Sequence, residues 1–114
     1  MEARAMFTII YLPEAVDFLN KVEVKARTKI LSNIEKSSYF LDIKFFKKLK
    51  NTVIWEFRTK YNKMQYRLLA FWDSNGESST LVVATNGFIK KQDKTPKNEI
   101  DHALELRRKY YEQK

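Results

Sequence analysis

The chain of 114 residues contains no cysteine, two glycines and two prolines. The absence of cysteine excludes disulfide bonds and metal sites that depend on thiolates. Glycine and proline are the usual residues of turns and loops, so their scarcity predicts that most of the chain lies in helices and strands with short connections. A glycine-rich loop for binding phosphate groups is excluded as well.

A single histidine, His102, leaves few ways to build a hydrolytic active site. No spaced set of histidine and carboxylate residues resembles a zinc or two-metal centre, and we expect neither a metal nor another cofactor. No serine lies in the sequence context of a nucleophile elbow, which argues against a serine hydrolase. We interpret His102 as a surface or half-buried side chain.

Long apolar runs are also missing. No stretch approaches the roughly 18 to 20 apolar residues that span a bilayer. The first residues, Met1-Glu-Ala-Arg-Ala, lack the basic end, apolar stretch and small-residue cleavage site of a signal peptide. We therefore expect a cytoplasmic protein that does not contact membranes.

Enough apolar residues are present for one hydrophobic core. Hydrophobic residues make up 44% of the chain and aromatic residues 14%, which argues against intrinsic disorder. The length fits one domain of ordinary size. We predict a single domain over residues 1–114, without a linker or an internal repeat.

Positive charge dominates the polar residues and indicates a polyanionic partner, with nucleic acid as the first candidate. The net charge is +8, and residues 41–114 hold sixteen basic and nine acidic residues, so seven of the eight excess charges lie there. The densest basic stretch surrounds two phenylalanines and a leucine, and consists of Lys44, Lys47, Lys48 and Lys50.

The first part of the chain is predicted to form a strand and two helices. Residues 6–12 are mostly β-branched, aromatic or apolar, as in a strand, and Pro13 suits the first turn of a helix that buries Val16 and Leu19. Apolar residues near the 3.6-residue period predict a second helix over 24–35. Its expected core-facing residues are Val24, Ile30, Leu31 and Ile34.

The second part is predicted to form three strands and a helix. Residues 52–61 and 64–72 alternate as the strands of a hairpin that turns at Asn62 and Lys63. The turn residues Asp73-Ser74-Asn75-Gly76 then precede a central strand over 80–86. Thr95 and Pro96 are suitable as N-cap and first residue of a C-terminal helix. The expected inner stripe of that helix is Ile100, Ala103, Leu104, Arg107 and Tyr111, and the predicted order is βααβββα.

Basic residues on the predicted hairpin are the most informative polar feature. The alternation puts Arg58, Lys60 and Arg67 on one face, opposite the face that carries Trp55, Tyr66 and Leu68. These charges could lie on the solvated outer face of a one-sided sheet. Taken together they favour an anion site, in which a central arginine could stabilise charge on a phosphodiester without a metal.

Four segments resemble one known family. They are Ile54-Trp55-Glu56-Phe57-Arg58, Tyr66-Arg67-Leu68-Leu69, Asn86-Gly87-Phe88-Ile89-Lys90-Lys91 and Lys94-Thr95-Pro96-Lys97-Asn98-Glu99-Ile100. Together they resemble the HigB-like branch of the RelE/ParE toxin superfamily, which includes phage-derived, host-inhibition-type toxins. The most specific part of the resemblance is the spacing from GFIKK to KTPKNEI.

The resemblance implies a fold and a function. The fold would be α+β and RelE-like: a twisted, mainly antiparallel sheet, two N-terminal helices and a C-terminal helix at its side. The function would be that of a type II toxin, a metal-independent, ribosome-dependent mRNA endoribonuclease that uses the RNA 2′-hydroxyl as nucleophile. Its partners would be the ribosome, mRNA and a cognate antitoxin, expected to be a HigA-like helix-turn-helix protein.

The resemblance also assigns candidate site residues. Arg67 would stabilise the scissile phosphate, and Lys90 and Lys91 would bind RNA or donate a proton, unless these lysines only dock on ribosomal RNA. Where RelE-type toxins have two lysines this chain has Ile54 and Glu56, so Glu56 is a candidate general base or a structural partner of Arg58 or Arg67. Further residues expected to bind RNA are Lys44, Lys47, Lys48, Arg58, Lys60, Lys63 and Lys94.

Two other functions stay open on the sequence alone. A ParE-like protein shares this fold but inhibits a protein target such as gyrase and cleaves nothing. A relic that binds RNA without any activity is the other possibility. Only the mRNA endoribonuclease would leave codon-phased cuts in messages.

Overall fold

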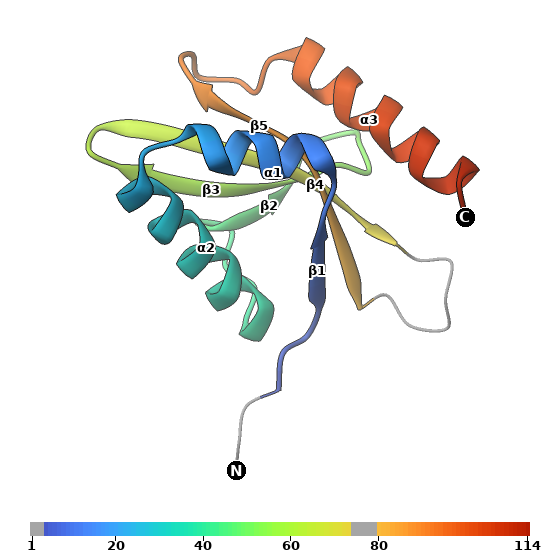
Figure 1. The fold of residues 1–114 in the computed structure, drawn as a ribbon, viewed down its shortest axis with the longest axis horizontal. Helices are drawn as coiled ribbons and strands as arrows, with labels where there is room; N and C mark the ends of the chain where they lie inside the picture. Colours follow the sequence, from blue (N-terminus) through green and yellow to red (C-terminus); the bar gives the residue numbers. More distant parts are fainter. Residues whose placement is uncertain (1–3, 74–79) are drawn as a thin grey trace.

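A five-stranded sheet forms the centre of the structure, a computed structural model that describes residues 4–73 and 80–114 (Figure 1). The elements, in chain order, are β1 (Thr8–Tyr11), α1 (Pro13–Lys21), α2 (Val24–Tyr39), β2 (Phe46–Lys48), β3 (Trp55–Tyr61), β4 (Met64–Asp73), β5 (Leu81–Lys90) and α3 (Lys97–Glu112). The α+β class and the three helices are as predicted. The predicted turn at Ser74, Asn75 and Gly76 lies outside the described residues.

The sheet is mixed, with strand order β1-β5-β4-β3-β2. Only β1 and β5 pair in parallel, and the other neighbours are antiparallel. The short strand β2 was not predicted, because three residues are too few to show an alternating pattern. It pairs with Trp55, Glu56 and Phe57, and the Phe45 carbonyl also accepts from the Arg58 amide, so residues 59–61 of β3 form a free edge within the described residues.

The β3–β4 hairpin turns where the sequence predicts. Asn62 and Lys63 have φ values of 50° and 66°, in the left-handed region that a two-residue hairpin turn requires. Tyr61 pairs with Met64 beside the turn, which fixes the register of the two strands. Consequently Glu56, Arg58 and Lys60 of β3 lie on one face of the sheet and Trp55 and Phe57 on the other.

Helices cover both faces of the sheet. Helices α1 and α2 pack with Phe57, Tyr66 and Leu68 on one face, the aromatic face. Helix α3 packs on the opposite face against a second core cluster around Leu69 and Phe71. Figure 1 shows α3 apart from α2, while His102 of α3 contacts Glu14 of α1. The face that could have been a solvated outer surface is therefore partly covered.

The prediction that four apolar helix residues lie in the core is wrong. Val16, Val24, Leu31 and Leu104 are between 37% and 65% exposed. Helices α1 and α2 instead approach the sheet through Ala15 and Ala26, which are fully buried and allow close contact. Helical periodicity identifies a helix, but the direction of its inner face depends on which residues fit against the strands. No helix of residues 4–73 and 80–114 has the length and apolarity to cross a bilayer.

Candidate anion-binding and catalytic site

Two arginines lie directly opposite each other on neighbouring strands. Arg58 of β3 and Arg67 of β4 are register partners in the hairpin, on the face that α3 partly covers. Like charges directly opposite each other destabilise a sheet, because their side chains extend side by side. The buried carboxylate of Glu56 offsets part of this repulsion, and a bound anion would offset more of it.

The hydrogen bonds of the two guanidinium groups leave donors unused. Arg67 donates from Nη1 to the Tyr66 carbonyl at 3.0 Å and from Nη2 to Gln65 Oε1 at 2.8 Å. Arg58 donates from Nη1 to the Ile43 carbonyl at 3.3 Å. Within the described residues the buried Nε of Arg58 has no hydrogen-bond acceptor, while the Nε of Arg67 is ion-paired instead. An unsatisfied buried donor is uncommon in native proteins and is consistent with a ligand that accepts from Arg58.

Glu56 forms a buried ion pair with Arg67. Oε1 of Glu56 lies 3.3 Å from Arg67 Nε, too poorly aligned for a hydrogen bond, and the residues are 3% and 4% exposed. The solvated-face interpretation is therefore wrong for this pair. Glu56 is thus a buried structural partner of Arg67, one of the two roles expected for it, and the ion pair holds the guanidinium in place beside Arg58.

Thr95 contributes a contact from the loop before α3. Its hydroxyl donates to Glu56 Oε1 at 3.0 Å. The sequence predicts Thr95 as the N-cap of the last helix, but that position is held by Pro96, without a side-chain cap. The helix begins one residue later than predicted, so Pro96 is the N-cap, and the Thr95 side chain serves as a donor to the buried carboxylate of Glu56. Thr95 thus joins the loop to the arginine pair through Glu56.

The electrostatics of the site lower the pKa values of two basic groups. Burial lowers the pKa of Arg67, an effect that Glu56 opposes and Arg58 reinforces. Burial also lowers the pKa of Lys90, and the neighbouring charges of Arg67 and Arg58 lower it further while Glu56 and Asp93 oppose them. Lys90 pairs with Gln65 across β4 and β5, so it shares the face of the arginine pair. A lysine with a lowered pKa is better able to exchange a proton near neutral pH.

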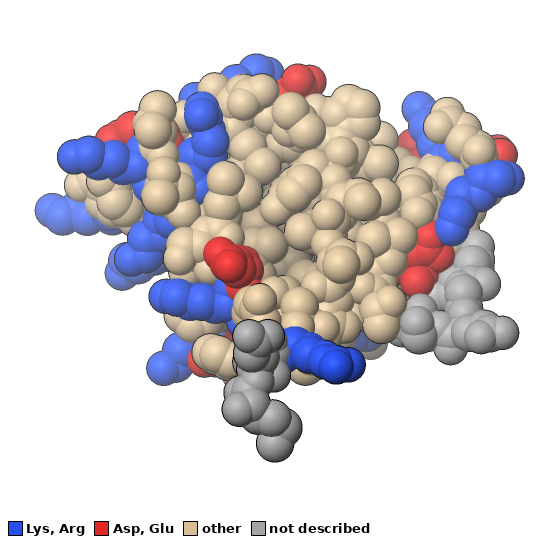
Figure 2. Space-filling view, turned by 60° about the horizontal axis from the view of Figure 1, so that its bottom comes forward, with Lys and Arg blue, Asp and Glu red and all other residues tan. Residues whose placement is uncertain are grey.

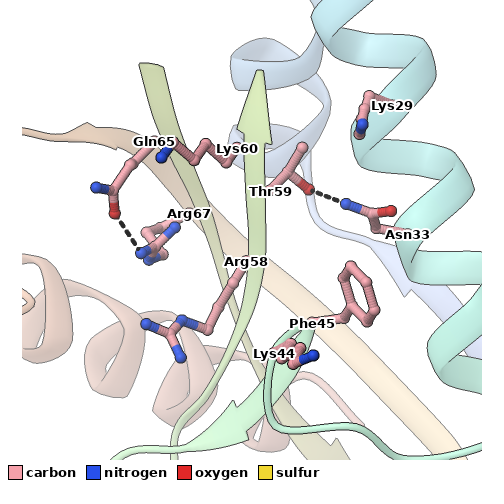
Figure 3. Close-up of a pocket in the computed structure, with 9 residues that line it drawn as sticks. All are labelled: Lys29, Asn33, Lys44, Phe45, Arg58, Thr59, Lys60, Gln65 and Arg67. Carbon is pink, nitrogen blue, oxygen red and sulfur yellow. Dashed lines mark hydrogen bonds between the residues drawn. The ribbon is translucent and has the colours of Figure 1, made fainter. Parts of the chain in front are cut away.

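An open pocket of about 410 Å³ adjoins the arginine pair (Figure 3). It curves around the free edge of β3: Arg58, Gln65 and Arg67 lie on one side of the strand and residues from α2 and the α2–β2 loop on the other. Its lining has five basic residues and no carboxylate. The full lining is Lys29, Asn33, Lys44, Phe45, Arg58, Thr59, Lys60, Gln65 and Arg67. We call it the arginine pocket.

Other predicted site residues are not gathered in the arginine pocket. Lys91 directly follows β5 and lines a different pocket with Phe18 and Tyr66 between α1 and β5. Lys47, Lys48, Lys63 and Lys94 are exposed on β2, the hairpin turn and the loop before α3. In Figure 2 the basic side chains gather toward the end of the molecule that holds the hairpin and α2, while the middle of that view has few charges.

His102 and the acidic residues form no metal centre in the described chain. His102 lies on the exposed side of α3 and contacts Glu14 of α1. Among residues 4–73 and 80–114, no three histidine or carboxylate side chains are grouped so that they could bind a metal ion.

Several residues at the site are not predicted from the sequence. Lys29 and Asn33 reach the arginine pocket from α2, and Gln65 lies beside Arg67 on β4. A polar residue on the inner face of a predicted helix is a weak signal that could have drawn attention to Asn33. For Thr95 the sequence held no signal, because its contact with Glu56 spans 39 residues.

Comparison with known proteins identifies the fold and the family. The structure of a double mutant of the E. coli toxin RelE, in the free state, superimposes with a TM-score of 0.61 at 14% identity and covers 90% of this chain and 97% of that one. The fold is therefore RelE-like, as predicted. No curated protein sequence matches the chain.

A family model matches residues 17–108, most of the chain. Its description is "Phage derived protein Gp49-like (DUF891)". The chain belongs to this phage-derived, Gp49-like family. The match spans both arginines, Glu56, Lys90 and Thr95.

Proposed function

We propose that this protein is the toxin of a type II toxin–antitoxin pair and cleaves mRNA on the ribosome. The observation that carries the proposal is the arginine pair, Arg58 and Arg67, with the unsatisfied buried Nε of Arg58, beside a pocket without carboxylates in its lining. Such a site suits a phosphodiester, which is dianionic where charge develops in the transition state. The RelE-like fold and the phage-derived family support the same reading.

The proposed reaction is an internal transfer within the RNA. The 2′-hydroxyl of one nucleotide loses its proton and attacks the adjacent phosphorus, and the bond from phosphorus to the next 5′-oxygen breaks. The leaving oxygen takes up a proton. The products are a 2′,3′-cyclic phosphate and a 5′-hydroxyl end, and no metal or oxidant enters the balance. Arg67 and Arg58 stabilise the pentacoordinate phosphate in this scheme.

Proton transfer is the role we assign to Lys90. It shares the face of the arginine pair, and its lowered pKa favours exchange of a proton near neutral pH. Glu56 is assigned as a positioning residue, because Thr95 and Arg67 already occupy its Oε1. Lys91, on the other side of the sheet, is assigned to RNA binding along with Lys94 and the exposed lysines of β2.

The partners in this proposal follow from charge. A chain of net charge +8 associates readily with ribosomal RNA and needs an inhibitor that blocks this contact. We propose a HigA-like helix-turn-helix antitoxin that covers the arginine pocket with acidic residues. An inhibitor that binds the chain but leaves the pocket open to a short RNA would contradict this arrangement.

Sequencing of 5′-hydroxyl RNA ends after brief induction tests the proposed function. We expect new ends that fall at a fixed codon position within translated messages, and none in untranslated RNA. Arg67→Lys should reduce their number about tenfold or more, because an ammonium cannot form the two-pronged contact of a guanidinium with phosphate. Growth arrest without new 5′-hydroxyl ends would instead support a protein target, as in a ParE-like toxin, and would overturn the proposal.

A further inference from the structure

The arginine pocket has a second half whose chemistry differs from that of the arginine pair. On the α2 side of β3, its wall is formed by Phe45, Thr59, Asn33 and Lys29 (Figure 3). This half contains an aromatic ring and neutral polar groups, whereas the other half contains two guanidinium groups. An aromatic ring beside closely spaced cations is the usual arrangement for binding single-stranded nucleic acid.

Phe45 is held in the pocket wall by its own backbone. Its amide donates to the Asp42 carbonyl at 2.9 Å, and its carbonyl accepts from the amide of Arg58 at 2.8 Å. The second hydrogen bond fixes the backbone of Phe45 to β3, the strand that carries Arg58. The next residue, Phe46, is 1% exposed and stacks on Phe57 in the core, whereas Phe45 is only half-buried. Of the two neighbours, Phe46 therefore serves the core and Phe45 is available to a ligand.

Two neutral polar side chains, Asn33 and Thr59, line the same half of the pocket as Phe45. Asn33 is 3% exposed in the middle of α2, and its Nδ2 donates to the hydroxyl of Thr59 at 3.1 Å. The amide and the hydroxyl thus lie in fixed positions at the pocket wall, with each residue 3% exposed. The Lys36 ammonium lies 5.9 Å from the centre of the Phe45 ring, and Lys29 and Lys44 are close by in the lining.

We propose that this half of the pocket binds the base of a nucleotide next to the phosphate held by Arg58 and Arg67, with the base stacked on Phe45. Beyond Arg58, whose amide donates to the Phe45 carbonyl, residues 59–61 of β3 pair with no strand on this edge, and one RNA strand could pass there from the arginine side to the Phe45 side. The assignment rests on the proposed function, since it presumes an RNA substrate. It adds a base-binding subsite built by α2 and the α2–β2 loop.

Binding of a short fluorescent RNA tests the subsite, measured by anisotropy with the full chain and with ribosomes present as a second arm. Phe45→Leu should weaken binding about 5- to 100-fold, the range expected for loss of one stacked base. Phe45→Trp should restore it. Phe40→Leu is the matched control, because Phe40 is 59% exposed on the same loop region and lies outside the pocket lining. Thermal melts confirm that each variant is folded.

A second RNA set separates stacking from other effects. In a series of RNAs that each carry one abasic nucleotide, the RNA that lacks the stacking base should bind equally to wild type and to Phe45→Leu. If Phe45→Leu binds every RNA like wild type while Lys60→Gln binds less tightly, the subsite is wrong and the phosphate site stands. If Phe45→Leu weakens only antitoxin binding, Phe45 is a protein contact and the subsite is again wrong. If wild type binds no RNA in either arm, the proposed function fails together with it.

Discussion

Arg67 is a buried residue, and this changes how its substitution should be tested. Removing one partner of a buried ion pair leaves the other charge without compensation, which costs about 3–5 kcal/mol. Arg67→Ala should therefore lower the free energy of unfolding by about 3 kcal/mol, because Glu56 stays buried beside it. Arg67→Lys keeps a positive charge and should cost clearly less. Urea denaturation of both variants measures the difference.

An equal stability of Arg67→Ala and wild type would contradict the buried ion pair. It would also restore the solvated face that the alternation allowed. Loss of activity in Arg67→Ala alone is ambiguous for this reason, and Arg67→Lys is the informative variant for function.

Lys90 provides a prediction about pH. Its pKa in the folded protein lies below the value of 10.5 that an ordinary lysine has, because of burial and the two arginines. Holding Lys90 charged therefore destabilises the fold at neutral pH, and this cost vanishes as pH rises through the folded pKa toward 10.5. Lys90→Met should raise the Tm at pH 7, and the gain should shrink toward pH 10.

The control for Lys90 is Lys25→Met, which removes an exposed charge at the start of α2. It corrects for the change in net charge. A constant Tm difference between Lys90→Met and wild type from pH 7 to pH 10 would show that the lysine titrates normally.

At the scale of elements, the close approach of α1 to β5 depends on Gly87. A Cβ at this position would lie 2.2 Å from Cδ2 of Phe18, far inside contact distance. Gly87→Ala must displace the ring and should cost about 1–3 kcal/mol, as overpacking does. The double variant Gly87→Ala with Phe18→Leu should recover part of the loss, which denaturation of the singles and the double measures. Additive losses in the double variant would rule out the ring as the cause.

The hairpin shows why part of the site could be predicted. The period of two and the turn at Asn62 and Lys63 together fix which residues of β3 and β4 share a face. That is enough to bring Arg58 and Arg67 together from the sequence. The burial of Glu56 was not predictable in the same way, because it depends on a loop and a helix that follow about 40 residues later.

The helices show that local sequence patterns do not predict which helix residues are buried. Their existence follows from periodicity, but Val24 and Leu31 are exposed while Asn33 and Ser37 are buried. Asn33 is tolerated inside because Thr59 accepts its hydrogen bond, a contact between residues 26 apart. Apolar character alone would always assign a valine such as Val24 to the core before a polar residue such as Asn33. Asn33 and Thr59 also line the arginine pocket, so the wrong core residues and the unpredicted site residue Asn33 have the same cause.

At the scale of the whole molecule, charge predicts how RNA binding depends on salt. Removing one lysine that neutralises a phosphate of a single strand reduces the slope of log K against log salt by about 0.7. Lys44→Gln and Lys60→Gln, both in the pocket lining, should each reduce the slope by about that amount. Lys25→Gln, outside the lining, should leave it unchanged. Titrations at several salt concentrations measure the slope, and equal slopes for all variants would remove these lysines from the RNA path.

The central claim is that the arginine pair makes this chain an mRNA-cleaving enzyme. Purified protein added to translating ribosomes, with RNA ends read by sequencing, tests it most directly. We predict codon-phased 5′-hydroxyl ends from wild type and from Lys25→Gln. Folded Arg67→Lys should give at least about tenfold fewer of these ends, and naked mRNA should give none. Undiminished cutting by Arg67→Lys, or no cutting by folded wild type on translating ribosomes, would contradict the claim.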